Sequence, residues 1–193
     1  DEVVAMLTEA AAQGHGRVRY LLGIVYHMGQ GVARDVDRAI ELYTQAGKQG
    51  HAAAYSNLGI LLEDERQDMD GAEEAYRAAI EVDRGLAQAD PGNANAHSNL
   101  GALLKNERQD LDGAEKAYRA AIEADPGHAS SHRNLGILLE ARAQDIERSG
   151  ADMEKAAALY DECAALWGVG KGADHAWTKG AQDDAARVRA ALP

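Results

Sequence analysis

The sequence predicts an all-α protein in which antiparallel helix pairs stack on one another, an architecture called an α-solenoid. The first observation is a tandem repeat, since residues 57–83 and residues 99–125 are identical at 21 of 27 positions. The second is that apolar residues recur at helical spacing within each copy, whereas no alternating strand pattern occurs. The third is that one helix pair cannot bury both of its apolar faces alone, so neighbouring pairs must stack.

Each copy predicts a helix, a turn, a second helix and a stop. In the second copy the apolar residues at helical spacing form two groups: Leu100, Leu103 and Leu104, then Ala114, Ala117, Tyr118, Ala121 and Ile122. A polar run at residues 105–113 separates the two groups. Asp125-Pro126-Gly127 ends the second helix, because proline lacks an N–H donor and disfavours helical backbone in the residue before it.

This unit resembles the tetratricopeptide repeat. The resemblance rests on Leu100-Gly101, Ala114, Tyr118, Ala121 and Pro126. Two further copies carry matching residues, the second more loosely: Leu58-Gly59, Ala72, Tyr76 and Ala79, then Leu135-Gly136, Ala156, Tyr160 and Cys163. The resemblance implies a right-handed solenoid in which the glycine and alanines lie where paired helices approach most closely, with the tyrosine filling the gap between them.

The region before these units resembles the related Sel-like repeat, on these residues: Leu22-Gly23, Tyr26, Gly29, Gly31-Val32, Asp35, Ala39, Tyr43, Ala46 and Gly50. Residues 1–15 also align with residues 37–51 at a constant offset of 36. We therefore expect one continuous solenoid, excerpted from something longer and divided as follows: 1–51, a Sel-like unit and half of a preceding one; 52–167, three tetratricopeptide repeats; 168–193, a linker and a capping helix.

Two interruptions of seven residues change the spacing of the repeats. The first lies at residues 84–90, and the second lies between Leu139 and Ala156, where a longer first helix or a longer turn fits equally well. Seven residues add about two helical turns, roughly 10 Å, and keep the same face inward. We therefore expect projecting helices. After Trp167, the glycine-rich residues 168–172 predict a connector that leads to a solvated capping helix.

Composition and charge exclude several classes of function. Acidic residues outnumber basic ones 32 to 20, and the net charge is −12. Such a surface repels phosphate backbones and anionic lipid, so we expect neither nucleic-acid binding nor membrane insertion. The sequence has no apolar run of membrane-spanning length and only one cysteine. An intracellular, cytoplasmic setting is the expectation.

No constellation of residues predicts catalysis, a metal or a cofactor. His128 and His132 are four residues apart, but no further ligands complete a zinc site, and His132 occupies a packing position before Leu-Gly. Cys163 falls where the other copies have a small buried alanine. The glycine run at 168–172 lacks the spacing and the preceding strand of a phosphate loop. Trp167 and Trp177 are expected in the core of the terminal cap.

One repeated feature points to a binding surface. Asparagine precedes Leu-Gly in all three tetratricopeptide-like units, and helical spacing places further residues on the same faces. The resemblance implies that these first helices line a concave groove. The sequence around the asparagines is similar to the repeats of O-linked N-acetylglucosamine transferases, in which the repeated asparagines along the groove, called an asparagine ladder, hold peptides. The predicted peptide-binding residues are Asn57, Ile60, Asp64, Asn95, Asn99, Ala102, Asn106, Ser130, Asn134 and Ile137.

These asparagines have a simpler explanation as tolerated polar residues that face water. Amide side chains can donate to a carbonyl and accept from an N–H of an extended peptide, so the functional interpretation is a non-catalytic scaffold for a peptide or a partner helix. Two alternatives remain. The chain is an assembly module of a larger repeat protein or complex, or it is the substrate-presenting segment of an enzyme whose catalytic domain is absent.

Overall fold

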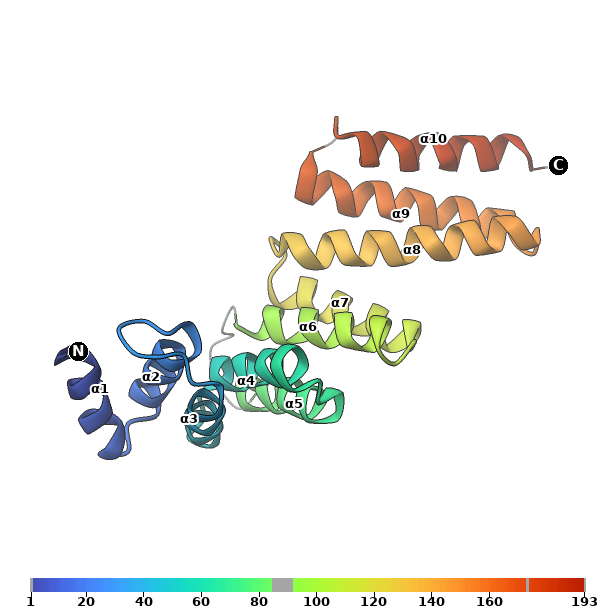
Figure 1. The fold of residues 1–193 in the computed structure, drawn as a ribbon. Coiled ribbons are helices and arrows are strands. Elements are labelled where there is room, and N and C mark those ends of the chain that lie inside the picture. The colour runs from blue at the N-terminus through green and yellow to red at the C-terminus, as the bar shows by residue number, and fades with distance from the viewer. Residues whose placement is uncertain (1, 85–91, 173, 193) are drawn as a thin grey trace. The chain divides into compact units, whose positions relative to one another are not determined.

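The computed structural model describes residues 2–84, 92–172 and 174–192, which form α-helices and no strand (Figure 1). The expectation of an all-α helical-repeat fold is confirmed. The chain divides into two compact units, residues 1–103 and 104–193. The helices are α1 (Glu2–Ala12), α2 (Gly16–Met28), α3 (Val36–Lys48), α4 (Ala52–Arg66), α5 (Met69–Arg84), α6 (Gly92–Asn106), α7 (Leu111–Ala124), α8 (Ala129–Ser149), α9 (Met153–Lys171) and α10 (Ala176–Ala190).

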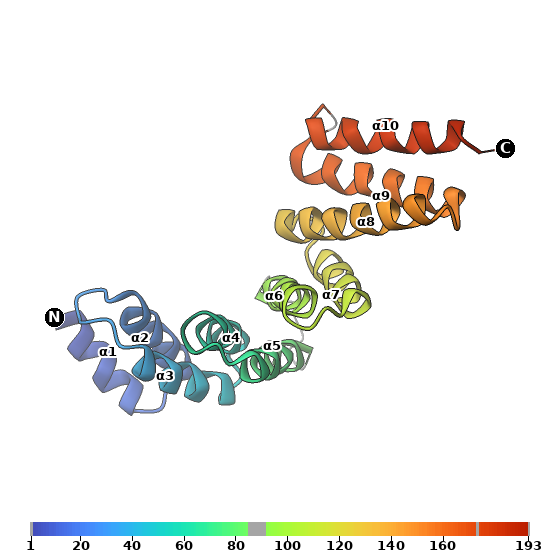
Figure 2. The ribbon, with the colours of Figure 1, turned by 45° about the vertical axis from the view of Figure 1, so that its right-hand side comes forward.

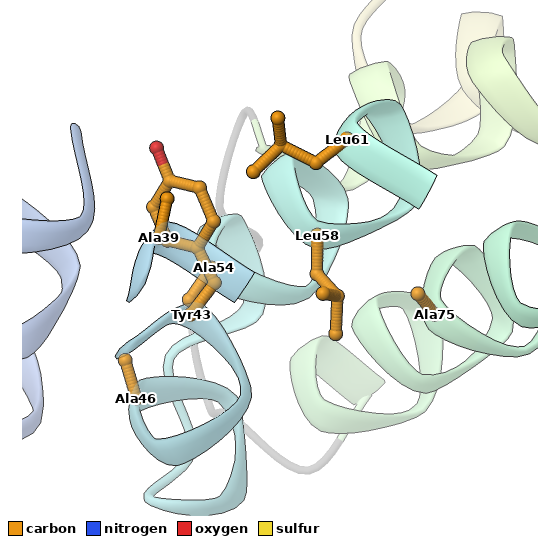
Figure 3. Close-up of a cluster of buried hydrophobic side chains, with 7 residues drawn as sticks. All are labelled: Ala39, Tyr43, Ala46, Ala54, Leu58, Leu61 and Ala75. Carbon is orange, nitrogen blue, oxygen red and sulfur yellow. The ribbon is translucent and has the colours of Figure 1, made fainter. Parts of the chain in front are cut away.

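In the first unit, α1 packs on α2, α2 on α3, α3 on α4, and α4 on α5. Small residues let the helices approach closely, and a tyrosine and leucines fill the remaining space. Figure 3 shows one such cluster, in which the side chains come from three successive helices. Its buried members are Ala39, Tyr43 and Ala46 of α3, Ala54, Leu58 and Leu61 of α4, and Ala75 of α5.

In the second unit, α7 packs on α8, α8 on α9, and α9 on α10 (Figure 2). The core between the last three helices includes Tyr160 of α9 and Val188 of α10. Helix α10 therefore covers the outer face of α9, the place expected of a capping helix. Its remaining surface is largely polar, with Arg187 and Arg189 in the last turn.

The polar turns between paired helices are built from two adjacent residues. Gln67 ends α4 in the left-handed backbone conformation (φ 53°), and Gln109 has the same conformation (φ 57°) before α7. The next residue caps the following helix, since Asp68 accepts from the N–H of Gly71 and Asp110 from that of Gly113, both at 2.9 Å. The repeated Gln-Asp pair thus both stops one helix and starts the next.

The glycine of Leu-Gly lies against an aromatic ring of the paired helix. A Cβ atom added to Gly23 would lie 2.7 Å from the ring of Tyr43, and one added to Gly59 would overlap the ring of Tyr76. Both tyrosines are almost completely buried. These contacts agree with the roles that the tetratricopeptide resemblance implies for this glycine and this tyrosine.

The helices α8 and α9 form the third tetratricopeptide-like unit, called the third hairpin below, and both are longer than their counterparts in the other two units. Helix α8 has 21 residues, compared with 15 in α4. At the turn end, the Tyr160 hydroxyl donates to Glu147 at 3.2 Å, as the Tyr76 hydroxyl donates to Glu63 at 2.9 Å, and each pair is 13 residues apart. The second interruption therefore lengthens the first helix rather than the turn.

The aromatic partner of Gly136 is consequently a different residue. A Cβ atom at Gly136 would overlap the indole of Trp167, which follows Tyr160 by seven residues. Ala143, seven residues after Gly136, is buried in the same cluster as Tyr160. The extra turns of α8 and α9 thus pack on each other and on α10, instead of projecting from the repeat. Of the first interruption, residues 85–90 lie outside the described residues.

The connector predicted at residues 168–172 is shorter than expected. Helix α9 continues through Lys171, and α10 begins at Ala176. The N–H of Gly172 still donates to the carbonyl of Gly168 at 3.1 Å, and Gly172 then takes φ +93°, which favours glycine. Glycines weaken a helix without breaking its hydrogen bonds, so a helix anchored by the buried Trp167 extends across them.

The buried tyrosines predict a loss of stability at alkaline pH. Burial raises the pKa of Tyr43, Tyr118 and Tyr160 to about 12. Unfolded tyrosine releases its proton near pH 10, so stability is complete below about pH 10 and falls as pH rises towards 12, by up to about 1.4 kcal/mol per pH unit for each tyrosine. Urea unfolding followed by circular dichroism between about pH 9 and pH 11 measures this slope.

Tyr118→Phe provides the control for this prediction. Burial is the cause of the raised pKa of Tyr118, and phenylalanine fills nearly the same space. The variant should fold at neutral pH and lose stability less steeply in alkali than the wild type. A free energy of unfolding that stays constant between about pH 10 and pH 11 would contradict the burial of these hydroxyls.

Candidate functional site

The first residue of the predicted asparagine ladder has an internal contact. Asn57 lies on α4, is half-buried, and its side-chain amide lies beside the hydroxyl of Tyr43 on α3. Burial of the ring raises the pKa of Tyr43 to about 12, and the Asn57 amide, a smaller effect, lowers it. His27 of α2 lies 3.4 Å from the same hydroxyl through Nδ1. Asn57 therefore helps to join α3 and α4, a role that the sequence did not indicate.

The other predicted residues are distributed over three helices. Residues on α4 and most of those on α6 belong to the first unit, whereas those on α8 belong to the second. The exposed members are Asp64, Asn95, Asn106, Ser130 and Ile137, and the half-buried members are Asn57, Ile60, Asn99, Ala102 and Asn134. Each ladder asparagine is followed by the buried Leu-Gly pair, so each lies at the edge of its helix-packing face. The function of this set as one site stays a prediction.

The histidines near α8 have structural partners. His132 is buried, and its Nε2 donates to the carbonyl oxygen of Pro126 at 2.9 Å. His128 Nδ1 lies 2.7 Å from the hydroxyl of Ser131. Within the described part of the chain, no group of three or more His, Cys, Asp or Glu side chains is arranged to hold a metal ion.

Cys163 is buried in the α8–α9 hairpin, where its thiol donates to the carbonyl oxygen of Gly136 at 3.3 Å. Burial raises the pKa of this thiol to about 12. We expect iodoacetamide to leave Cys163 unmodified in the folded chain and to modify it in urea, because the thiolate is the reactive form. Mass spectrometry of the alkylated protein checks this, and rapid labelling of the native chain would contradict it.

A cavity of about 290 Å³ lies between α8, α9 and α10, within the second unit. Its walls are mainly apolar and include both tryptophans of the chain. The lining residues are Ile137, Glu140, Trp167, Ala176, Trp177, Gly180, Ala181 and Asp184. The expectation that both tryptophans lie in the core is therefore half wrong. Trp167 is buried, but Trp177 is 44% exposed, because Ala181, Ala185 and Val188 supply the buried face of α10.

Two carboxylates face this cavity. Asp184 pairs with Arg187 at 2.8 Å, and Arg187 also pairs with Glu147. Glu140 is half-buried and makes no ion pair with any residue that the structure describes. Burial, and secondly the negative charge of Asp184, raise the pKa of Glu140 above its usual value. The cavity therefore combines one unneutralised carboxylate with two indole rings whose centroids are 5.8 Å apart.

Sequence reasoning missed this cavity because its walls come together only through the longer arms of the third hairpin. Glu140 and Trp167 are 27 residues apart, and the connector predicted at 168–172 separated Trp167 from the helix that carries Trp177. The available signal was the position of Trp167 seven residues after Tyr160, which keeps the same helix face.

None of the helices in the described segments is long and apolar enough to cross a membrane.

Comparison with protein families places a Sel1 repeat at residues 18–51, where the sequence showed Sel-like spacing. Sel1 repeats generally serve protein–protein interaction, and their fold is typically non-catalytic. The helices α2 and α3 form this repeat. A comparison with curated protein sequences found no match.

Solved structures with the same fold include other helical-repeat proteins. A Sel1 repeat protein from Oxalobacter formigenes is 20% identical, with a TM-score of 0.60 over 95% of this chain and 77% of that one. The protein c5321, a protective antigen of uropathogenic Escherichia coli with an SLR fold, is 20% identical, with a TM-score of 0.61 over 98% of this chain and 44% of that one. MamA is 19% identical, with a TM-score of 0.56 over 97% of this chain and 89% of that one. The similarity supports a Sel1-like and tetratricopeptide-like helical-repeat fold.

Proposed function

We propose that this chain, with its Sel1 repeat at residues 18–51, is a non-catalytic scaffold that binds an extended peptide of a partner protein along its first helices. The observation that supports this most directly is the repeated asparagine before Leu-Gly. Asn57, Asn99 and Asn134 are all half-buried at the edge of a packed face, where an amide is held in place but still reaches solvent. Each can donate to and accept from a peptide backbone.

Asn57 has a double role in this proposal. Its amide lies beside the Tyr43 hydroxyl, and an amide group has both a donor and an acceptor with which to contact a bound peptide backbone as well. Exposed polar neighbours such as Asp64 and Asn106 would border the peptide. An acidic border favours a neutral or basic ligand, in keeping with the net charge of −12.

The test compares capture of partners from native lysate by the wild-type chain and by the Asn57→Ala, Asn99→Ala, Asn134→Ala variant. Circular dichroism and thermal unfolding must first show that both fold, since Asn57 joins α3 and α4. The matched control replaces exposed residues outside the ladder, Gln45→Ala and Gln144→Ala. We expect partners to be lost with the triple variant alone. If the triple variant still captures them, the ladder is not the binding site.

A second candidate function, as an assembly module, is favoured by the outer face of α1. Val3 and Met6 are 67% and 66% exposed and lie three residues apart on this helix, while Val4 and Leu7 pack inward. Light scattering coupled to size-exclusion chromatography measures the mass of the wild type and of Val3→Lys, Met6→Lys. A wild-type oligomer that the double variant converts to a monomer would support assembly, and a monomer at all concentrations would oppose self-assembly through this face.

A further inference from the structure

The cavity between α8, α9 and α10 is lined by a carboxylate that pairs with no cation among the residues that the structure describes. Glu140 lines the cavity from α8, and Asp184 lines it from α10. Arg187 forms ion pairs with both Asp184 and Glu147 but not with Glu140. A half-buried carboxylate without a cationic partner is unfavourable, and a cation that enters the cavity would remove this cost.

The walls of the cavity restrict what kind of cation fits. Ile137 and the two tryptophans provide an apolar surface, and Trp177, whose ring also contacts Trp167 and His175, is 44% exposed. The volume of about 290 Å³ suits one long side chain rather than a large cofactor. A small hydrated ion would leave the indole surfaces without a contact. A planar guanidinium pairs with a carboxylate and stacks on an aromatic ring at the same time.

We propose that this cavity binds an arginine side chain of a partner protein, with Glu140 pairing with the guanidinium and Trp177 contacting its plane. The inference rests on the proposed function as a protein-interaction scaffold. It concerns a separate surface, which shares only Ile137 with the predicted ladder set. An acidic or a purely apolar side chain fits less well, because the first is repelled by Glu140 and the second leaves this carboxylate unpaired.

The two tryptophans make the cavity directly observable. They are the only tryptophans in the chain, and both line the cavity, so the indole N–H signals of a ¹⁵N-labelled sample report on its occupancy. The probe is the blocked tripeptide acetyl-Ala-Arg-Ala-amide, titrated into the full chain at low ionic strength. The matched probe replaces arginine by citrulline, which has the same shape without the charge.

We expect saturable shifts of the indole signals with the arginine peptide and about tenfold weaker binding of the citrulline peptide, because the ureido group of citrulline keeps N–H donors but has no positive charge to pair with Glu140. Glu140→Gln should weaken arginine binding by a similar factor. Glu123→Gln, an exposed position on α7 outside the cavity, should leave it unchanged. Trp177→Leu, at an exposed position, provides a second test and should also weaken binding.

Three results would overturn the proposal: no saturable shift of either indole signal up to about 20 mM peptide, equal binding of the arginine and citrulline peptides, or unchanged binding in a correctly folded Glu140→Gln variant. A lysine peptide that binds as tightly as the arginine peptide would overturn the assignment to guanidinium. If the asparagine triple variant loses its partners while the indole signals remain unmoved, the arginine site is wrong and the ladder stands. If the triple variant keeps its partners while the arginine peptide shifts the indole signals, the ladder is wrong and the arginine site stands.

Discussion

Replacing Trp167 by alanine is expected to lower the free energy of unfolding by about 3–5 kcal/mol, the usual cost of truncating a large buried aromatic side chain. Trp167 is 4% exposed, lies against the backbone of Gly136, and its indole Nε1 donates to the carbonyl of Arg133 at 3.5 Å. Alanine would leave a cavity where α8 and α9 are closest. Urea unfolding followed by far-ultraviolet circular dichroism measures the change.

The matched variant is Trp177→Ala, which removes the same side chain from a more exposed position. Trp177 is 44% exposed, so its loss should cost clearly less than that of Trp167. Equal destabilisation by the two substitutions would contradict the assignment of Trp167 as the aromatic filler of the third hairpin. A loss below about 1 kcal/mol for Trp167→Ala would mean that α8 and α9 do not depend on the contact with Gly136.

The sequence was sufficient to predict helix pairs because the signals for them are local. Apolar spacing around Leu100 and Tyr118, the polar run at residues 105–113 and the Asp125-Pro126-Gly127 stop each act within a few residues. The roles of Gly59 and Tyr76 were implied by the resemblance to the tetratricopeptide repeat. The first helix of the third hairpin was left open between two alternatives, since a heptad insertion preserves the helix face and gives no local sign of where it is accommodated.

The candidate site was harder to predict because it depends on contacts between distant residues. Asn57 looked equivalent to Asn99 and Asn134 in the sequence, but only the packing of α3 on α4 brings its amide beside the Tyr43 hydroxyl. The cavity lined by Glu140 and Trp177 is formed by residues of three helices that are up to 47 positions apart in the chain, so no local pattern indicates it. The helix α9 also continues across Gly168 and Gly170, against the usual preference of glycine.

Tyr76→Ala is expected to cost about 3–5 kcal/mol of folding free energy, for the same reason as the loss of Trp167. Tyr76 is 1% exposed, and its ring occupies the space above the backbone of Gly59. Its hydroxyl also donates to Glu63 at 2.9 Å. Tyr76→Phe separates the two contributions, since it keeps the ring and removes only this hydrogen bond, whose net value as a bond to a charged group is about 1.5–3 kcal/mol.

Gly59→Ala tests the same contact from the other helix. A methyl group there would overlap the ring of Tyr76, so the substitution should cost about 1–3 kcal/mol in the wild-type chain. In the Tyr76→Ala background the ring is absent, and the added methyl should be neutral or stabilising because alanine favours helix over glycine by about 1 kcal/mol. The double-mutant cycle should therefore give a coupling energy of about 1 kcal/mol or more. Additive effects of the two substitutions would show that glycine is needed at position 59 for a reason other than the tyrosine ring.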